Sequence, residues 1–103
     1  MTKGNNHEFE LDDKGFMKEP ERWTEEIAGK LAAMQNITQL NDDHWKVINY
    51  IRHYYLEYGI APPVKMVSKK TGYDSRLISQ LFPAGAAQGA CKIAGLSEPT
   101  GCV

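Results

Sequence analysis

Apolar residues recur at helical spacing along much of the chain, and the longest such pattern covers residues 42–58. Its apolar stripe and flanking positions are Val47, Ile48, Ile51, Tyr54, Tyr55 and Tyr58. Asn41 or Asp42 can cap the start of a helix here, and Gly59 can end it. Since this is the broadest apolar surface in the sequence, we expect residues 42–58 to form the central helix.

A second helical pattern lies earlier, in residues 20–35. Trp23, Ile27, Leu31 and Met34 follow one another at spacings of four, four and three residues. Pro20 suits a first helical turn. The pattern predicts an amphipathic helix from about 20 to 35, with Trp23 and Met34 in the core.

The segment before that helix alternates instead of following a helical period. His7, Phe9 and Leu11 alternate with acidic residues, a turn sequence ends at Gly15, and Phe16 resumes the apolar pattern. This arrangement predicts a small N-terminal β-hairpin that packs on the helices.

Two short helices are expected after Pro62-Pro63. The first runs to Thr71-Gly72, and Asp74 or Ser75 caps a second that ends at Pro83. The inward residues of the second are Leu77, Ile78, Leu81 and Phe82. Two short helices around a glycine-containing turn give a helix-turn-helix pattern.

Residues 85–103 differ in composition from everything before them. They contain four glycines, Pro99 and both cysteines, Cys91 and the penultimate Cys102. Glycine raises the entropy cost of ordering a segment, and proline prevents a continuous helix. We therefore predict a single mainly α domain over residues 1–103, with a hairpin and helical body over 1–83 and a flexible arm over 84–103 that exposes two thiols.

Composition narrows the class of protein. The chain has 103 residues, of which 42% are hydrophobic and 24% charged, as in ordinary globular domains. No apolar run approaches the roughly 20 residues that span a bilayer, and the start lacks the apolar core of a signal peptide. We expect a cytoplasmic protein, in which a cysteine pair is more often reactive than structural.

Several site chemistries are disfavoured. The cysteines have ten residues between them and lack the short spacing of zinc ligands, while His7, His44 and His53 belong to other elements. We interpret His44 and His53 as surface or internally hydrogen-bonded histidines. A cysteine hydrolase would need a base held rigidly beside the thiol, and phosphate-binding loop motifs are absent.

The net charge of -1 conceals a local excess of basic residues. Lys65, Lys69, Lys70 and Arg76 lie in the helix-turn-helix region, and Lys92 lies in the arm. They are candidate contacts for DNA phosphates, for an acidic protein partner, or for an anionic sulfur species approaching the thiols. The small number of basic residues argues against DNA binding as the main function.

The cysteines themselves allow two interpretations. The glycines and proline between Cys91 and Cys102 permit the chain to fold back, and closing so short a loop costs little entropy. Two unrelated thiols are the alternative. The predicted exposure of the arm favours a reactive pair.

The arm sequence, PAGAAQGACKIAGLSEPTGCV from Pro83 to Val103, resembles the C-terminal arm of the DsrC/TusE family, historically called the gamma subunit of dissimilatory sulfite reductase. The resemblance extends to Trp23–Ala28, His44–Ile48 and Tyr58–Val64. It implies a small helical domain with an N-terminal hairpin, a helix-turn-helix and a mobile arm.

The resemblance also implies a mechanism. The protein would be a sulfur carrier and co-substrate, not an enzyme. Cys102 would enter the reductase and accept a sulfite-derived sulfur, and Cys91 would then attack to release a trisulfide between the two cysteines. The implied partners are the reductase alpha and beta subunits and a membrane-bound complex that reduces the trisulfide.

The siroheme and iron–sulfur clusters would belong to the reductase, so no cofactor is expected in this chain. Family members with only the penultimate cysteine resemble sulfur-relay proteins of tRNA thiolation. That relay and a helix-turn-helix DNA-binding regulator stay open as alternatives, as does the direction of the sulfur pathway, reductive or oxidative.

Overall fold

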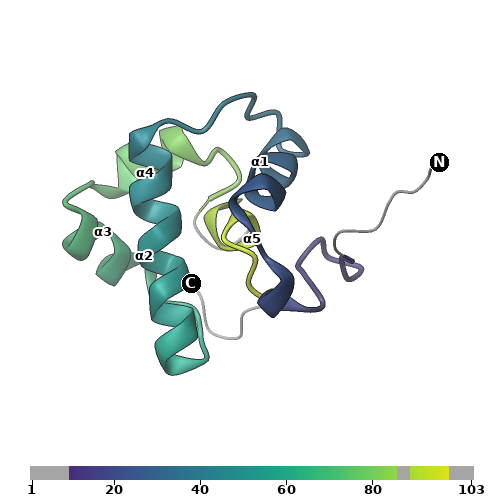
Figure 1. Ribbon diagram of the computed structural model, residues 1–103. Coiled ribbons are helices and arrows are strands. Elements are labelled where there is room, and N and C mark those ends of the chain that lie inside the picture. The colour runs from purple at the N-terminus through teal and green to yellow at the C-terminus, as the bar shows by residue number, and fades with distance from the viewer. Residues whose placement is uncertain (1–9, 86–88, 98–103) are drawn as a thin grey trace.

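The computed structural model describes residues 10–85 and 89–97. Within them the chain is mainly helical, which confirms the expected fold class. The elements are the short 3-10 helix η1 (Pro20–Arg22) and the helices α1 (Glu25–Ala33), α2 (Asp42–Tyr58), α3 (Val64–Thr71), α4 (Ser75–Leu81) and α5 (Cys91–Ile93). Figure 1 shows α5 between α1 and α2, with α3 on the other side of α2.

Helix α2 has the predicted bounds because both of its ends are specified locally. The Asn41 side chain accepts from the backbone N–H of His44 at 3.0 Å, and the His44 ring accepts from the N–H of Asn41 at 3.2 Å. Gly59 ends the helix with a φ of 76°. Glycine adopts this left-handed conformation without a steric penalty.

The buried face of α2 is shorter than predicted. Val47, Ile48 and Ile51 have no exposed surface, but Tyr58, which belongs to the apolar stripe predicted for this helix, is 60% exposed. Arg52 is 7% exposed and takes a buried position on this face. Tyr58 lies in the last turn of α2, beyond the buried positions of this helix.

The helix expected over residues 20–35 is interrupted. Trp23 has extended backbone angles, φ -63° and ψ 139°, and α1 starts only after Thr24, whose side chain accepts from the N–H of Ile27. A capping threonine requires a non-helical conformation, so η1 and α1 are separate. Met34, predicted in the core, is 64% exposed because α1 ends at Ala33 and the buried face does not continue.

The N-terminal hairpin is not supported by the described residues. They contain an isolated antiparallel bridge between Leu11 and Met17 and no strand, and His7 and Phe9 lie outside the described range. The Asp12 carboxylate accepts from the backbone N–H of Phe16 at 3.0 Å and closes a tight turn. Phe16 and Met17 are both 1% exposed, and burial of two consecutive side chains breaks the alternation of a strand.

Helices α3 and α4 form as predicted. Gly72 ends α3 with a φ of 83°, and the Asp74 side chain caps α4 by accepting from the N–H of Leu77 at 2.8 Å. Ile78, Leu81 and Phe82 are buried, and Leu77 is half-buried. Helix α3 packs against both α2 and α4.

Residues 89–97 were expected on an exposed arm, and this prediction was wrong. Cys91, Ile93 and Leu96 are each at most 1% exposed, and α5 packs on α1 and α2. The small residues that suggested mobility instead let the backbone approach its neighbours closely. The part of the predicted arm at 86–88 and 98–103 lies outside the described residues.

Candidate functional site

Cys91 is the first residue of α5 and is 1% exposed. It is surrounded in sequence by other buried residues, including Ala90, Ala94 and Leu96. Cys102, the other predicted reactive residue, lies outside the described range. The structure therefore places one of the two cysteines, and it places that one in the core.

Four side chains from the helical body bind the segment around Cys91, and we call them the cradle: Trp23, Gln35, Arg52 and Tyr55. The indole Nε1 of Trp23 donates to the Ile93 carbonyl at 2.8 Å. Gln35 Nε2 donates to the Gly89 carbonyl at 3.3 Å. The Tyr55 hydroxyl shares a hydrogen bond with Ser97 Oγ at 3.2 Å. The cradle thus contacts both ends of segment 89–97.

Arg52 is the most connected member of the cradle. Its guanidinium donates to the carbonyls of Ala94 and Gly95 at 3.2 and 3.3 Å and to the Pro20 carbonyl at 2.7 Å. It also lies 4.8 Å from the centroid of the Trp23 ring, at cation–π distance. One side chain therefore ties the segment before α1 to the segment after α5.

Burial lowers the pKa of Arg52 from its ordinary value, although Tyr55 and Glu21 act in the opposite direction. Arginine nonetheless stays protonated in proteins. Among the described residues its charge is compensated by three carbonyl dipoles and an aromatic ring.

Two glycines let the segment fit against the cradle. Gly95 has a φ of 77°, and a Cβ there would overlap the ring of Trp23. At Gly89 a Cβ would lie 3.1 Å from Phe82 Cβ and 3.3 Å from Gln35 Oε1. Glycine is required at 95 for both backbone conformation and space.

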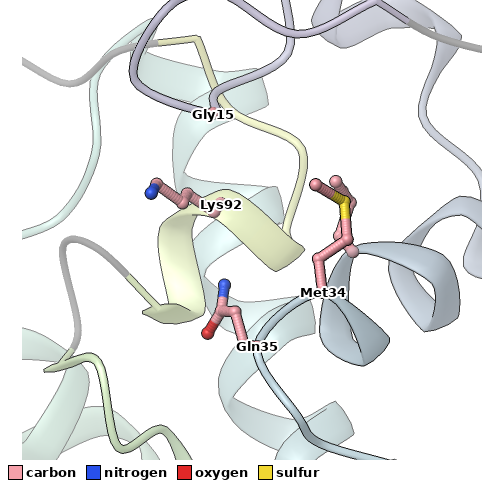
Figure 2. Close-up of a pocket in the computed structure, with 5 residues that line it drawn as sticks. Gly15, Met34, Gln35 and Lys92 are labelled. Atoms are coloured by element: carbon pink, nitrogen blue, oxygen red, sulfur yellow. The ribbon is translucent and has the colours of Figure 1, made fainter.

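A small hollow lies beside α5, lined by Gly15, Leu31, Met34, Gln35 and Lys92 (Figure 2). Lys92, a predicted anion or partner contact, is half-buried and has its ammonium 5.3 Å from the centroid of the Phe16 ring. Gln35 Oε1 is buried without a hydrogen-bond partner in the part of the chain that the structure describes. The hollow borders the cradle, because Gln35 belongs to both.

The other predicted basic contacts lie elsewhere. Lys65, Lys69 and Lys70 are exposed on α3 and line one surface hollow together. Arg76 is exposed on α4 and does not line that hollow. The structure thus brings together the three lysines of this group.

The histidines behave as expected. His44 is 8% exposed, and its Nε2 lies 2.9 Å from the Leu81 carbonyl, so it is internally hydrogen-bonded. His53 is exposed, and His7 is outside the described range. Among residues 10–85 and 89–97, no three His, Cys, Asp or Glu side chains are grouped as metal ligands would be.

Sequence reasoning missed the cradle. A signal existed for Arg52, because it follows Ile51 and lies four residues after Ile48, which places a charge within an apolar helix face. Buried arginines need several acceptors, and exposed backbone carbonyls of another segment provide them. Tyr55 was expected beside the apolar stripe but not as a contact of segment 89–97, and no comparable signal marks Gln35.

No described helix combines the length and apolarity needed to cross a membrane.

Comparison with known proteins gives consistent results. Residues 3–103 match a family model described as DsrC like protein. The gamma subunit of dissimilatory-type sulfite reductase from Nitratidesulfovibrio vulgaris is 41% identical over 95 residues, covering 92% of this chain and 90% of the relative. The sulfurtransferase TusE of Salmonella typhi is 38% identical, covering 93% of this chain and 94% of the relative.

Solved structures agree with the sequence matches. The oxidized gamma subunit of dissimilatory sulfite reductase (DsrC) from Archaeoglobus fulgidus is 43% identical, with a TM-score of 0.82 and 92% of both chains covered. The DsrC/gamma subunit from Pyrobaculum aerophilum is 47% identical, with a TM-score of 0.79, covering 92% of this chain and 86% of that one. With a family model matched over nearly its whole length, the chain belongs to the DsrC-like family.

Proposed function

We propose that this protein is a sulfur carrier that works with a dissimilatory sulfite reductase. Cys102 accepts a sulfite-derived sulfur, and Cys91 releases it as a trisulfide. The observation that carries the proposal is the cradle, because four side chains hold the segment containing Cys91 at a defined place. The similarity to a protein named as a subunit of that reductase supports the choice of partner.

The length of chain after Ser97 supports different roles for Cys91 and Cys102. Cys102 lies five positions after the last described residue, Ser97. Such a stretch spans at most roughly 18 Å when extended. Tyr55 holds Ser97 through a hydrogen bond, and in the proposal Cys102 is the thiol that reaches the partner.

The proposed step balances in atoms, electrons and protons. Sulfite and the two thiols, with two electrons from the reductase and four protons, give the trisulfide and three waters. The thiols supply two further electrons as their S–H bonds are replaced by S–S bonds. Later reduction of the trisulfide takes four electrons and four protons and yields hydrogen sulfide and both thiols; we assign this step to a membrane-bound reducing complex.

Burial of Cys91 adds a requirement to the proposal. Its sulfur cannot form a bond with an incoming persulfide while it is 1% exposed. Segment 89–97 must therefore move away from part of the cradle before Cys91 reacts. Loss of individual cradle hydrogen bonds should make that movement easier.

We assign no cofactor to this chain; siroheme and iron–sulfur clusters belong to the reductase in this scheme. We expect the cycle to run in the cytoplasm, where a reducing environment returns the thiols to their reduced form. In an organism that oxidises sulfur the same carrier would run in reverse.

The test combines the reduced protein with a dissimilatory sulfite reductase, sulfite and a limiting supply of electrons. Intact mass is measured before and after alkylation. The proposal predicts a gain of one sulfur atom less two hydrogens, with neither cysteine alkylated. If Cys102→Ala leaves the sulfur products unchanged, the carrier proposal is wrong.

The main alternative is a relay like that suggested by the name of the TusE relatives. A relay needs only a persulfide on Cys102. Cys91→Ala would then retain sulfur transfer, whereas the trisulfide scheme loses product release. The same variant therefore separates the two functions.

DNA regulation is the remaining candidate, based on the exposed lysines of α3. Its test is binding to promoter DNA over a series of salt concentrations. Direct phosphate contact predicts that affinity falls with salt and that Lys69→Ala, Lys70→Ala and Arg76→Ala reduce the slope. Unchanged slopes would exclude this surface as a DNA contact.

A further inference from the structure

Two adjoining surface hollows on the α3 side of α2 share Met66 and Lys70. We call this surface the α2–α3 face and define it by Tyr54, Tyr58, Lys65, Met66, Lys69 and Lys70. The tyrosines come from the last turns of α2, and the other four residues come from α3. The face thus spans the contact between two packed helices.

The face has an apolar floor that is open to solvent. Tyr58 is 60% exposed and Met66 is 36% exposed. They are two of the five large hydrophobic residues that are exposed in the described part of the chain, and both line the same hollow. Concentrated apolar surface of this kind is typical of a site that another molecule covers.

The rim of the face is basic. Lys65, Lys69 and Lys70 are exposed around Met66, and Glu57 is the acidic residue that lines the adjoining hollow. His53 also lines that hollow. An apolar floor with a cationic rim complements a segment that has an apolar anchor flanked by carboxylates.

The arrangement of the tyrosines argues against nucleic acid as the occupant. The rings of Tyr54 and Tyr58 lie 4.5 Å apart and are tilted by 47°, so they pack on each other. Tyr50 continues the row, 6.1 Å from Tyr54. Base stacking needs accessible ring faces, and the chain as a whole carries a net charge of -1.

A second copy of this chain is also a poor occupant. A symmetric dimer through this face would bring the two sets of lysines together. Like charges across an interface are unfavourable. The charge pattern therefore favours a different protein over self-association.

We propose that the α2–α3 face is a docking surface for a partner protein that presents an acidic segment with an apolar anchor. This inference rests on the proposed function, under which the partner is the sulfite reductase. Helix α5 packs on α1 and α2, whereas α3 packs on α2 and α4, so docking here leaves the cradle uncovered. The partner can hold the carrier while segment 89–97 moves.

The test measures affinity for the catalytic subunits of a dissimilatory sulfite reductase without sulfite, using the reduced full chain at low and high salt. The variants are Lys69→Glu/Lys70→Glu for the rim and Tyr58→Ser for the floor. Lys18→Glu/Lys30→Glu is the matched control, because it changes the net charge equally away from this face. Circular dichroism checks that each variant is folded.

We expect each face variant to weaken binding by about tenfold or more and the control by less than about twofold. The effect of the lysine variant should shrink at high salt. Binding of that variant within about twofold of the wild type would overturn the docking proposal.

Further outcomes separate this inference from the proposed function. If the face variants bind normally and the protein still gains sulfur, docking here is wrong and the carrier function stands. If the wild type neither binds the reductase nor gains sulfur, both proposals are wrong. The face variants are also tested for binding to transfer RNA and for dimers by sedimentation. If they keep the affinity for the reductase but lose transfer-RNA binding, nucleic acid is the occupant. If they keep that affinity but lose dimers, a second copy of the chain is the occupant.

Discussion

The indole N–H of Trp23 donates a hydrogen bond to the carbonyl of Ile93 across 70 residues of sequence, at 2.8 Å. This bond joins the segment before α1 to the helix that contains Cys91. It shows that segment 89–97, which is largely buried, contacts the N-terminal part of the protein.

Trp23→Phe should destabilise the protein by about 1–3 kcal/mol, because the buried Ile93 carbonyl loses its donor. The aromatic ring is retained, so the loss reports mainly the hydrogen bond. Urea unfolding followed by circular dichroism measures the change. Trp45→Phe, at another half-buried tryptophan, is the control; an equal loss there would contradict a specific role for Trp23.

Gly95→Ala should be much more destabilising than Gly59→Ala. Both glycines have a positive φ, 77° and 76°, so both substitutions incur a similar backbone penalty of about 1 kcal/mol. Only at Gly95 would the new methyl group overlap Trp23, whereas no atom of the described residues lies within 4 Å of a methyl group at Gly59. The difference in unfolding free energy between the variants measures the overlap, and similar values would show that the segment does not pack against Trp23.

Arg52→Lys should expose Cys91 without abolishing the fold. Lysine keeps the charge but cannot reproduce the planar fork that reaches Pro20, Ala94 and Gly95 together. We expect alkylation of Cys91 to accelerate by about tenfold or more, because local opening of segment 89–97 becomes easier. Mass spectrometry in a Cys102→Ala background measures the rate.

The matched control for Arg52→Lys is Arg76→Lys, at an exposed position on α4. It should leave the alkylation rate of Cys91 unchanged. Equal rates in the two variants would mean that Arg52 does not hold the segment closed.

Asp12 should make the N-terminal turn sensitive to acid. Its pKa lies below the ordinary 3.8, chiefly because the carboxylate accepts from the N–H of Phe16. A lowered pKa in the folded state means that this stabilisation is fully present above the ordinary value and is lost as the pH falls through the lowered one. Thermal unfolding between neutral pH and pH ~3 should therefore show a smaller acid-induced decrease for Asp12→Asn than for the wild type. Asp13→Asn is the neighbouring control, and an identical acid response of all three proteins would contradict the assignment.

The sequence determined the helices whose ends are specified by nearby residues. Asn41 and Gly59 set α2, and Asp74 caps α4 through its own side chain. These interactions join residues a few positions apart, so they can be recognised without knowing the rest of the fold. The family resemblance was also read from local sequence motifs, and the match to the family model confirmed it.

Tertiary structure decided which surfaces are covered. Composition predicted that residues 89–97 are mobile. Instead, the small side chains in this segment let α5 pack closely against the cradle. Helical spacing grouped Met34 and Tyr58 with core residues, but both side chains are more than half exposed. Burial depends on partners far away in sequence, such as Trp23 for Ile93, and a local pattern does not specify those partners.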